Sequence, residues 1–242
     1  MKTNLNYNQY IPTQILFGAG QLNNLHAQSM PGKRALIVIS NGKSTLDNGY
    51  LARTEEELHQ AGVETEVFNG IMPNPTVANS VAGANAARKF KADFLVALGG
   101  GSVMDCSKAI ALLATNEGDL WDYVTVGSGK GQPIQNRPLP IIAITTTAGT
   151  GSETDGCGVI TKEETNEKAF IMHSSLFPVL AIVDSELMLS VPPQFTAFQG
   201  FDALFHSVEG FIAASANLAS DMNAREAIRN IARYLPRAVK DG

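Results

Sequence analysis

Short apolar runs alternate along the chain with longer amphipathic segments. The apolar runs that predict strands are Arg34–Ser40, Val63–Phe68, Phe94–Leu98 and Leu139–Thr145. The amphipathic segments Val77–Phe90 and Val103–Thr115 predict helices, and Thr54–Ala61 looks like the end of another helix that Gly62 stops. Strands without polar alternation, separated by helices, indicate an α/β fold with a parallel sheet covered on both faces. Ligands of such sheets bind at the carboxyl ends of the strands, so the functional groups are expected there.

The pattern changes near Val191-Pro192-Pro193. Beyond these prolines the apolar residues from Phe201 to Ile212 fall at helical spacing, and a second amphipathic helix is predicted over roughly Asp221 to Lys240. We therefore expect two domains, a Rossmann-like α/β domain over residues 1–187 and a partial helical domain over residues 188–242. Two helices alone have few elements to cover their apolar faces.

Composition narrows the range of partners. Hydrophobic residues make up 44% of the chain and charged residues 17%, which is typical of a globular protein. The net charge of -5 and the lack of a basic run argue against a nucleic-acid partner. No apolar run approaches the ~20 residues of a membrane span, the start of the chain does not look like a secretory signal, and Cys106 and Cys157 have no metal-like spacing. We expect a cytoplasmic protein without a membrane partner.

The stretch LGGGSVMDCSK, residues 98–108, places three glycines between a predicted strand and a predicted helix. Glycines weaken regular structure, but they let the backbone approach a phosphate, and the free N–H groups of a helix start point at such an anion. The same stretch also fits an ordinary tight turn in which Ser102 and Asp105 form a capping-box-like pair. Both interpretations can hold together.

A second unusual stretch, TTTAGTGSE over Thr145–Glu153, again follows a buried strand. Its hydroxyl groups and glycines can bend closely around a polar ligand and hydrogen-bond to it. A single loop of this kind is most simply a polar loop. Two such loops at neighbouring strand ends favour a nucleotide.

The third stretch is GFDALFHSVE over Gly200–Glu209. Asp202 and His206 stand four residues apart on a predicted helix, so both side chains lie on one face, about 6 Å apart along the axis. A carboxylate and an imidazole so placed can share a divalent ion such as iron or zinc. A simple acid–histidine pair on a helix surface is the alternative, although the neighbouring residues are apolar.

Together and in this order, these stretches resemble the iron-containing (group III) alcohol dehydrogenases. The matching segments are GGGSVMDCSKAIA, PLPIIAITTTAGTGSE, LAIVDSELMLSVPP, GFDALFHSVEGFIA, MPNPT and YIPTQILFGAG. The resemblance covers nearly the whole chain and implies a dinucleotide-binding α/β domain followed by a helical domain, with the active site between them. This is the dehydroquinate synthase-like fold.

The resemblance also implies roles for individual residues. Gly99, Gly100, Gly101 and Ser102 would hold the pyrophosphate of the dinucleotide, with Asp105 near the nicotinamide side. The rest of the cofactor site would be lined by Asn74, Thr146, Thr147 and Lys168. Asp202 and His206 would be catalytic metal ligands for Fe(II) or Zn(II).

Three departures from the family pattern matter. Thr145 replaces a usual proline, and Thr154-Asp155 replace a common Val-Thr. The family has two further histidine ligands, which would follow Gly242. We therefore expect a truncated member of the family with weak metal binding unless His173 or a partner chain contributes a ligand, because catalytic sites of this kind usually use about three protein ligands.

Cofactor preference is read from the end of the first predicted strand. NAD-preferring relatives have an aspartate there, which would repel a 2′-phosphate. Here the strand ends in Ser40, followed by Asn41, Gly42 and Lys43. We predict binding of NADP in preference to NAD, with Ser40 and Gly42 in the site.

The expected activity is the reversible oxidation of a small primary alcohol to an aldehyde by a homo-oligomer. One alternative is a truncated module that binds a dinucleotide without turnover. The other is a non-redox enzyme on the same scaffold, since a shared fold does not decide function.

Overall fold

The structure is a computed structural model and describes residues 6–241. The chain divides into two compact units. The first, called here the sheet unit, consists of Pro12–Thr146 and Ser152–Leu187. The second, called the helical unit, consists of residues 6–11, 147–151 and 188–241 among those described. The sheet unit holds nearly all of the buried apolar side chains.

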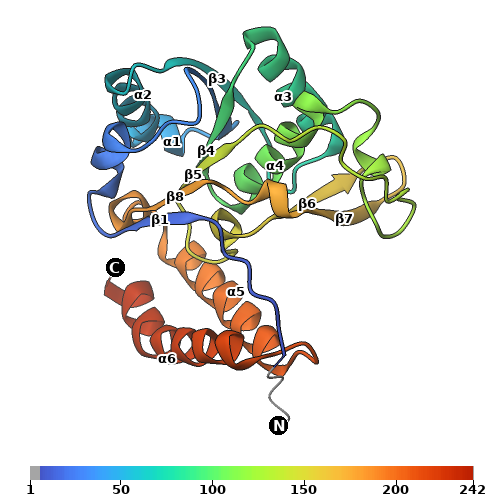
Figure 1. Ribbon diagram of the computed structural model, residues 1–242. Helices are drawn as coiled ribbons and strands as arrows, with labels where there is room; N and C mark the ends of the chain where they lie inside the picture. Colours follow the sequence, from blue (N-terminus) through green and yellow to red (C-terminus); the bar gives the residue numbers. More distant parts are fainter. Residues whose placement is uncertain (1–5, 242) are drawn as a thin grey trace. The chain divides into compact units, whose positions relative to one another are not determined.

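The sheet unit is built on six parallel strands in the order β1-β8-β5-β4-β2-β3 (Figure 1). The strands are β1 (Gln14–Phe17), β2 (Arg34–Ser40), β3 (Glu64–Ile71), β4 (Phe94–Gly99), β5 (Ile141–Thr145) and β8 (Leu180–Val183). Every residue of β4 and β5 is buried, because these two strands occupy the middle of the sheet. The α/β class with a Rossmann-like parallel sheet, predicted from the apolar runs, is confirmed.

Helices cover both faces of this sheet, as a parallel sheet requires. The α-helices of the sheet unit are α1 (Ser44–Asp47), α2 (Tyr50–Gln60), α3 (Val77–Phe90) and α4 (Gly101–Thr115). Its 3-10 turns are η1 (Gln21–Ala27), η2 (Leu120–Asp122), η3 (Ser152–Thr154), η4 (Ser174–Leu176) and η5 (Ser185–Met188). The last residue of η5, Met188, belongs to the helical unit. Alternate residues of β2 enter opposite cores: Leu36 and Val38 pack with α3 and α4, whereas Ile37 packs with η1 and α2.

A two-stranded antiparallel hairpin, β6 (Cys157–Lys162) and β7 (Glu167–Met172), packs beside α4 (Figure 1). Gly158 permits the contact, because a Cβ at this position would lie 2.7 Å from the carbonyl oxygen of Asp105. A single bridge between Thr76 and Thr161 connects the hairpin to the start of α3.

The helical unit contains α5 (Pro193–Ile212) and α6 (Leu218–Asp241). The two helices pack against each other at Gly200, where a Cβ would overlap the side chain of Leu235. No residue of α5 is buried, and Ala224 is the one buried residue of α6 among positions 218–240. Within residues 6–241, none of the helices combines the length and the apolar character that crossing a bilayer requires.

The long expected elements correspond closely to the observed ones, whereas several short elements were not predicted. β2 and α3 have the predicted bounds, and α4 begins two residues before the predicted Val103. The short strands β1 and β8 and the hairpin of β6 and β7 were not predicted. The predicted domains were two continuous ranges, 1–187 and 188–242, whereas the observed helical unit also includes the loop 147–151.

Candidate functional site

The glycine stretch lies where β4 ends and α4 begins, at the carboxyl edge of the sheet. Gly99 pairs with Thr145 at the end of β5, and the N–H of Thr146 donates to the carbonyl oxygen of Gly99 at 3.0 Å. The glycine turn and the first two residues of the second unusual stretch, Thr145 and Thr146, are therefore neighbours in the sheet unit. A Cβ at Gly99 would lie 2.7 Å from Cγ2 of Val103, so this turn is too tight for a side chain.

The start of α4 presents free backbone donors. Gly100 is the N-cap residue, with φ -91° and ψ -169°. It has no side chain that could accept a hydrogen bond from the first N–H groups of the helix. Its carbonyl oxygen accepts the N–H groups of Val103 and Met104. No partner is found within residues 6–241 for the N–H groups of Gly101 and Ser102, which are two of the donors that a helix start leaves unpaired. Such donors at the positive end of a helix dipole suit a phosphate group.

Asp105 does not take part in a cap. Its carboxylate accepts from the hydroxyl of Ser152 at 2.7 Å and from the backbone N–H of Val159 at 3.1 Å. The capping-box alternative for Ser102 and Asp105 is therefore wrong, because the carboxylate turns toward the η3 segment and the hairpin. Burial raises the pKa of Asp105, against the hydrogen bonds from Ser152 and Val159 and the charge of Lys108, which lower it.

Asn74 and Lys168 meet although 94 residues separate them in sequence. The ammonium group of Lys168 on β7 donates to Oδ1 of Asn74 at 2.9 Å, and both residues are exposed. Asn74 follows β3 and has a φ of 54°, a conformation that asparagine tolerates better than most residues. The pair adds an amide and a cation on the hairpin side of the sheet unit.

Ser40 and Gly42 lie at the carboxyl end of β2, next to β4 in the sheet. Ser40 is half-buried and Gly42 is exposed. Lys43, also exposed, precedes α1. This end of β2 carries small polar groups and one cation, with no carboxylate from Ser40 to Lys43.

The candidate metal ligands Asp202 and His206 lie on one face of α5. Nε2 of His206 is 3.5 Å from Oδ1 of Asp202, and the side chains are 58% and 45% exposed. One imidazole and one carboxylate at this spacing fit part of a divalent-ion site. Among the described residues, no group of three or more His, Cys, Asp or Glu side chains forms a possible metal site.

The loop 147–151, which includes Thr147, packs on α5 within the helical unit. The side-chain oxygen of Gln199 accepts the backbone N–H of Ala148 at 3.0 Å. A Cβ at Gly149 would lie 2.9 Å from Oδ2 of Asp202, so the glycine lets the backbone come close to this carboxylate. The sequence placed these residues in two separate motifs, but the structure brings them together.

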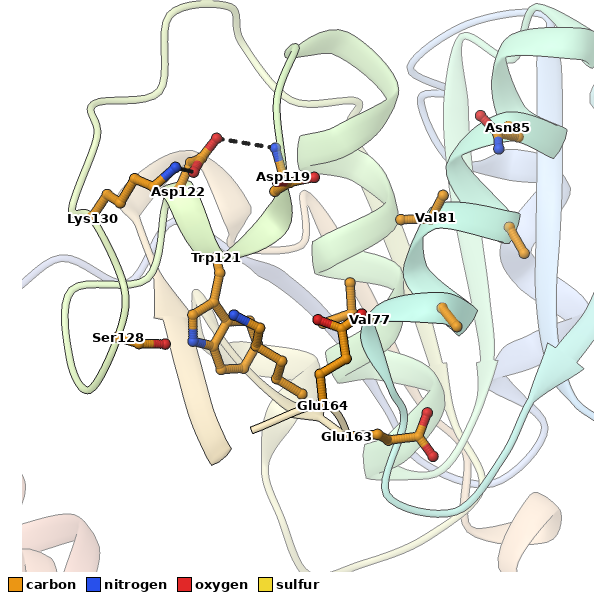
Figure 2. A pocket seen from close by; sticks show the side chains of 13 residues that line it. Val77, Val81, Asn85, Asp119, Trp121, Asp122, Ser128, Lys130, Glu163 and Glu164 are labelled. Carbon is orange, nitrogen blue, oxygen red and sulfur yellow. Dashed lines mark hydrogen bonds and ion pairs between the residues drawn. The ribbon is translucent and has the colours of Figure 1, made fainter. Parts of the chain in front are cut away.

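A cavity of about 630 Å³ lies elsewhere in the sheet unit, between α3, η2 and the turn from β6 to β7 (Figure 2). Val77 and Val81 line one side, and the ion pair of Asp122 and Lys130, at 2.6 Å, lies on the other. None of the candidate residues lines this cavity. We assign the site to the strand ends, because the unpaired helix donors lie there.

The sequence-based prediction missed Lys108 and its three partners. Lys108 is 1% exposed, and its ammonium group reaches Ser152, Asp155 and Cys157 at 2.6–2.8 Å. The sequence predicted a helix over Val103–Thr115, and a lysine among its apolar residues was the available signal. Its partners follow the second unusual stretch or belong to it, and only the folded chain joins them.

Comparison with known proteins identifies what the chain resembles. The family model described as iron-containing alcohol dehydrogenase matches residues 12–185. Alcohol dehydrogenase 4 of Schizosaccharomyces pombe is 40% identical over 96% of this chain and 54% of its own length. The 1,3-propanediol dehydrogenase of Klebsiella pneumoniae is 37% identical over 98% of this chain and 60% of its own.

Solved structures agree with the sequence relatives. The crystal structure of sulfoacetaldehyde reductase from Bifidobacterium kashiwanohense, in complex with NAD+, superposes with a TM-score of 0.88 at 35% identity. It is covered to 62% of its length by 98% of this chain. The chain thus spans between half and two thirds of the length of these relatives.

Proposed function

The chain belongs to the iron-containing alcohol dehydrogenase family, and on this premise we propose that it serves the reversible oxidation of a small primary alcohol to its aldehyde, with a nicotinamide dinucleotide and a divalent metal. The observation that carries the proposal is the glycine turn of β4 and α4 beside Thr146, with the N–H groups of Gly101 and Ser102 unpaired in the described chain. A homo-oligomer in the cytoplasm, with no nucleic-acid or membrane partner, belongs to the same proposal.

The residues of the sheet unit fit a dinucleotide. Gly101 and Ser102 donate two backbone N–H groups toward its phosphates, and Gly99 and Gly100 keep side chains out of the turn. Thr146 contributes a hydroxyl beside this turn, and Thr147 another from the loop 147–151. Asn74 and Lys168 add an amide and a positive charge for the remaining polar groups of the cofactor. When bound, the nicotinamide ring supplies the hydride chemistry.

Asp202 and His206 would hold the metal as two of its ligands, through a carboxylate oxygen and an imidazole nitrogen. The bound metal supplies a Lewis acid that lowers the pKa of the alcohol. The donor set suits Fe(II), in keeping with the family's description, and Zn(II) is a second candidate. Gln199 holds the loop 147–151 against the same helix and so keeps its backbone next to Asp202.

The preferred dinucleotide is NADP. Ser40 ends β2 where an aspartate would repel a 2′-phosphate, and the exposed Lys43 lies close by in sequence. The solved relative that was crystallised with NAD+ leaves NAD as the alternative.

A second candidate function is dinucleotide binding without turnover. It is favoured by the presence of two candidate metal ligands, where a catalytic site usually has about three from the protein. Turnover and binding are separate measurements, so one experiment distinguishes the two functions.

The test mixes the chain with Fe(II) or Zn(II), butyraldehyde and either NADPH or NADH, and follows cofactor absorbance. Binding is measured by cofactor fluorescence. We expect Asp202→Ala and His206→Ala to lower turnover by about 100-fold or more while leaving dinucleotide binding intact. Gly101→Val is expected to abolish binding, because the new side chain occupies the phosphate position.

Glu209→Ala, an exposed carboxylate on the same helix as the metal ligands, is the matched control and should leave both measurements unchanged. Binding without turnover in every metal would support the second candidate function. Turnover that survives Asp202→Ala would contradict the metal assignment, and tighter binding of NADH than of NADPH by tenfold would overturn the cofactor preference.

A further inference from the structure

Lys108 is a charged side chain enclosed by the sheet unit. It lies on α4, two turns from the glycine turn, and its side chain is 1% exposed. Burying an ammonium group is costly unless it is paired and hydrogen-bonded. A lysine in such a place therefore has a specific set of partners that the fold maintains.

Those partners come from one short segment that follows β5. The ammonium group donates to the hydroxyl and the carbonyl oxygen of Ser152, both at 2.8 Å. It also lies 2.6 Å from Oδ1 of Asp155 and 2.6 Å from the carbonyl oxygen of Cys157. Three ammonium protons thus serve four acceptors, two of which are backbone groups. Lys108 fastens the segment between β5 and β6 to α4.

The hydrogen bonds continue from this segment to Asp105. The hydroxyl of Ser152 accepts from Lys108 and donates to Oδ1 of Asp105 at 2.7 Å. An ammonium group can only donate and an ionised carboxylate can only accept, so the direction of both bonds is fixed. The other carboxylate oxygen of Asp105 accepts the N–H of Val159 on β6.

We propose that Lys108 is a positioning residue of the dinucleotide site, which acts through Ser152 to hold the Asp105 carboxylate in place on the first turns of α4. This inference rests on the proposed function, because it assigns Asp105 to the cofactor site. It adds a part of the site that touches no cofactor itself. We call the two hydrogen bonds from Lys108 to Ser152 and from Ser152 to Asp105 the tie. The tie holds the Asp105 carboxylate in position.

The electrostatics of the site support this role. Burial raises the pKa of Asp105, while the hydrogen bond from Ser152 and the charge of Lys108 lower it. The charged groups that act on Asp105 are Lys108 on the same helix and Asp155 on the neighbouring segment. Burial, and to a smaller extent the charge of Asp105, raises the pKa values of the thiols of Cys106 and Cys157. Without the tie, burial would favour the protonated form of Asp105 still more.

The experiment uses the whole 242-residue chain and measures two quantities. The first is the pKa of the Asp105 carboxyl group, from an NMR titration of its carboxyl carbon without cofactor. The second is the affinity for NADPH and NADH as a function of pH. We expect Lys108→Met to raise the pKa of Asp105 by about one unit and to weaken dinucleotide binding about tenfold. Ser152→Ala should change the Asp105 pKa and the dinucleotide affinity in the same directions as Lys108→Met, but by less. Lys108→Arg should keep both quantities closer to the wild-type values than Lys108→Met does.

Lys130→Met is the matched control, because Lys130 pairs with Asp122 at the same 2.6 Å but is 63% exposed. It should change neither quantity. If Lys108→Met fails to fold by circular dichroism, Ser152→Ala decides, since it leaves the contact of Lys108 with Asp155 in place. An unchanged Asp105 pKa and unchanged binding in Ser152→Ala and in a folded Lys108→Met would overturn the inference. A wild-type chain that binds no dinucleotide would contradict the proposed function alone, while the carboxyl titration still tests the tie.

Discussion

The two units of the chain bury their apolar residues to very different extents. In the sheet unit, the central strands β4 and β5 are buried at every position, and helices cover both faces. In the helical unit, α5 has no buried residue, and four of its phenylalanines are more than half exposed. The hydrophobic contribution to stability scales with the apolar area removed from water. We therefore expect the sheet unit to hold most of the folding free energy of this chain.

The proposed dinucleotide groups and the proposed metal ligands also differ in how well packed neighbours support them. The groups assigned to the dinucleotide lie mostly at the carboxyl edge of the sheet, next to buried strands. The proposed metal ligands Asp202 and His206 lie on α5, among exposed side chains. Sites supported by packed neighbours hold their geometry more closely than sites without such support. Dinucleotide binding should therefore tolerate perturbation of α5 better than metal binding does.

The largest expected effect is a loss of core packing in the sheet unit. Phe94→Ala removes a fully buried side chain at the start of β4 and should destabilise the sheet unit by about 3–5 kcal/mol. Phe205→Ala removes a side chain that is 61% exposed and should cost less than about 0.5 kcal/mol. Urea unfolding followed by the fluorescence of Trp121, the single tryptophan of the chain, measures the sheet unit, and the helix band of circular dichroism, to which α5 and α6 contribute, is followed in parallel for the helical unit. Equal costs for the two variants would contradict the comparison.

Much of the sheet unit could be predicted from the sequence, because its strands are continuous apolar runs and its long helices have regular periodicity. The bounds of β2 and α3 follow directly from these patterns. The hairpin could not be predicted in this way. Its strands alternate between buried and half-buried or exposed residues, and Gly158 and the bridge from Thr76 to Thr161 position it through contacts distant in sequence.

The candidate site was predictable in its backbone and less so in its side-chain network. Glycines between a strand and a helix fit a phosphate site as well as an ordinary tight turn, and because their effect on the backbone is local, the turn itself could be predicted. The tie from Lys108 through Ser152 to Asp105 joins residues up to 47 positions apart in sequence, so no local pattern identifies Ser152 as the partner of Lys108. The nearness of Gly149 to Asp202 is likewise a property of the folded chain.

Substituting alanine for one glycine in each unit should change stability with opposite signs. A Cβ on Gly83 in α3 would overlap the side chain of Ile110, so Gly83→Ala should destabilise the sheet unit by about 1–3 kcal/mol. A Cβ on Gly210 in α5 meets no atom within 4 Å, so Gly210→Ala should stabilise its helix by about 0.5–1 kcal/mol. Thermal unfolding at the helix band of circular dichroism, together with Trp121 fluorescence, measures both. A stabilising Gly83→Ala would mean that the core of the sheet unit is looser than the packing indicates.

The smallest expected effect concerns acid and the hairpin of the sheet unit. Glu167 at the start of β7 accepts hydrogen bonds from the backbone and the hydroxyl of Ser128 and from the hydroxyl of Thr165, and these lower its pKa from 4.5 to about 2. A lowered carboxyl pKa contributes stability that is complete above the unfolded value and is lost as the pH falls toward the folded value.

Glu167→Gln should therefore be less stable than the wild type near neutral pH, and the difference should shrink as the pH falls from 4.5 toward about 2. The measurement is the urea midpoint of Trp121 fluorescence at several pH values. Glu164→Gln is the control, because Glu164 lies in the turn between β6 and β7, three residues before Glu167. It is exposed and makes no side-chain hydrogen bond within the described residues. A difference between Glu167→Gln and the wild type that stays constant across this range would show that the hydrogen bonds of Glu167 do not depend on its charge.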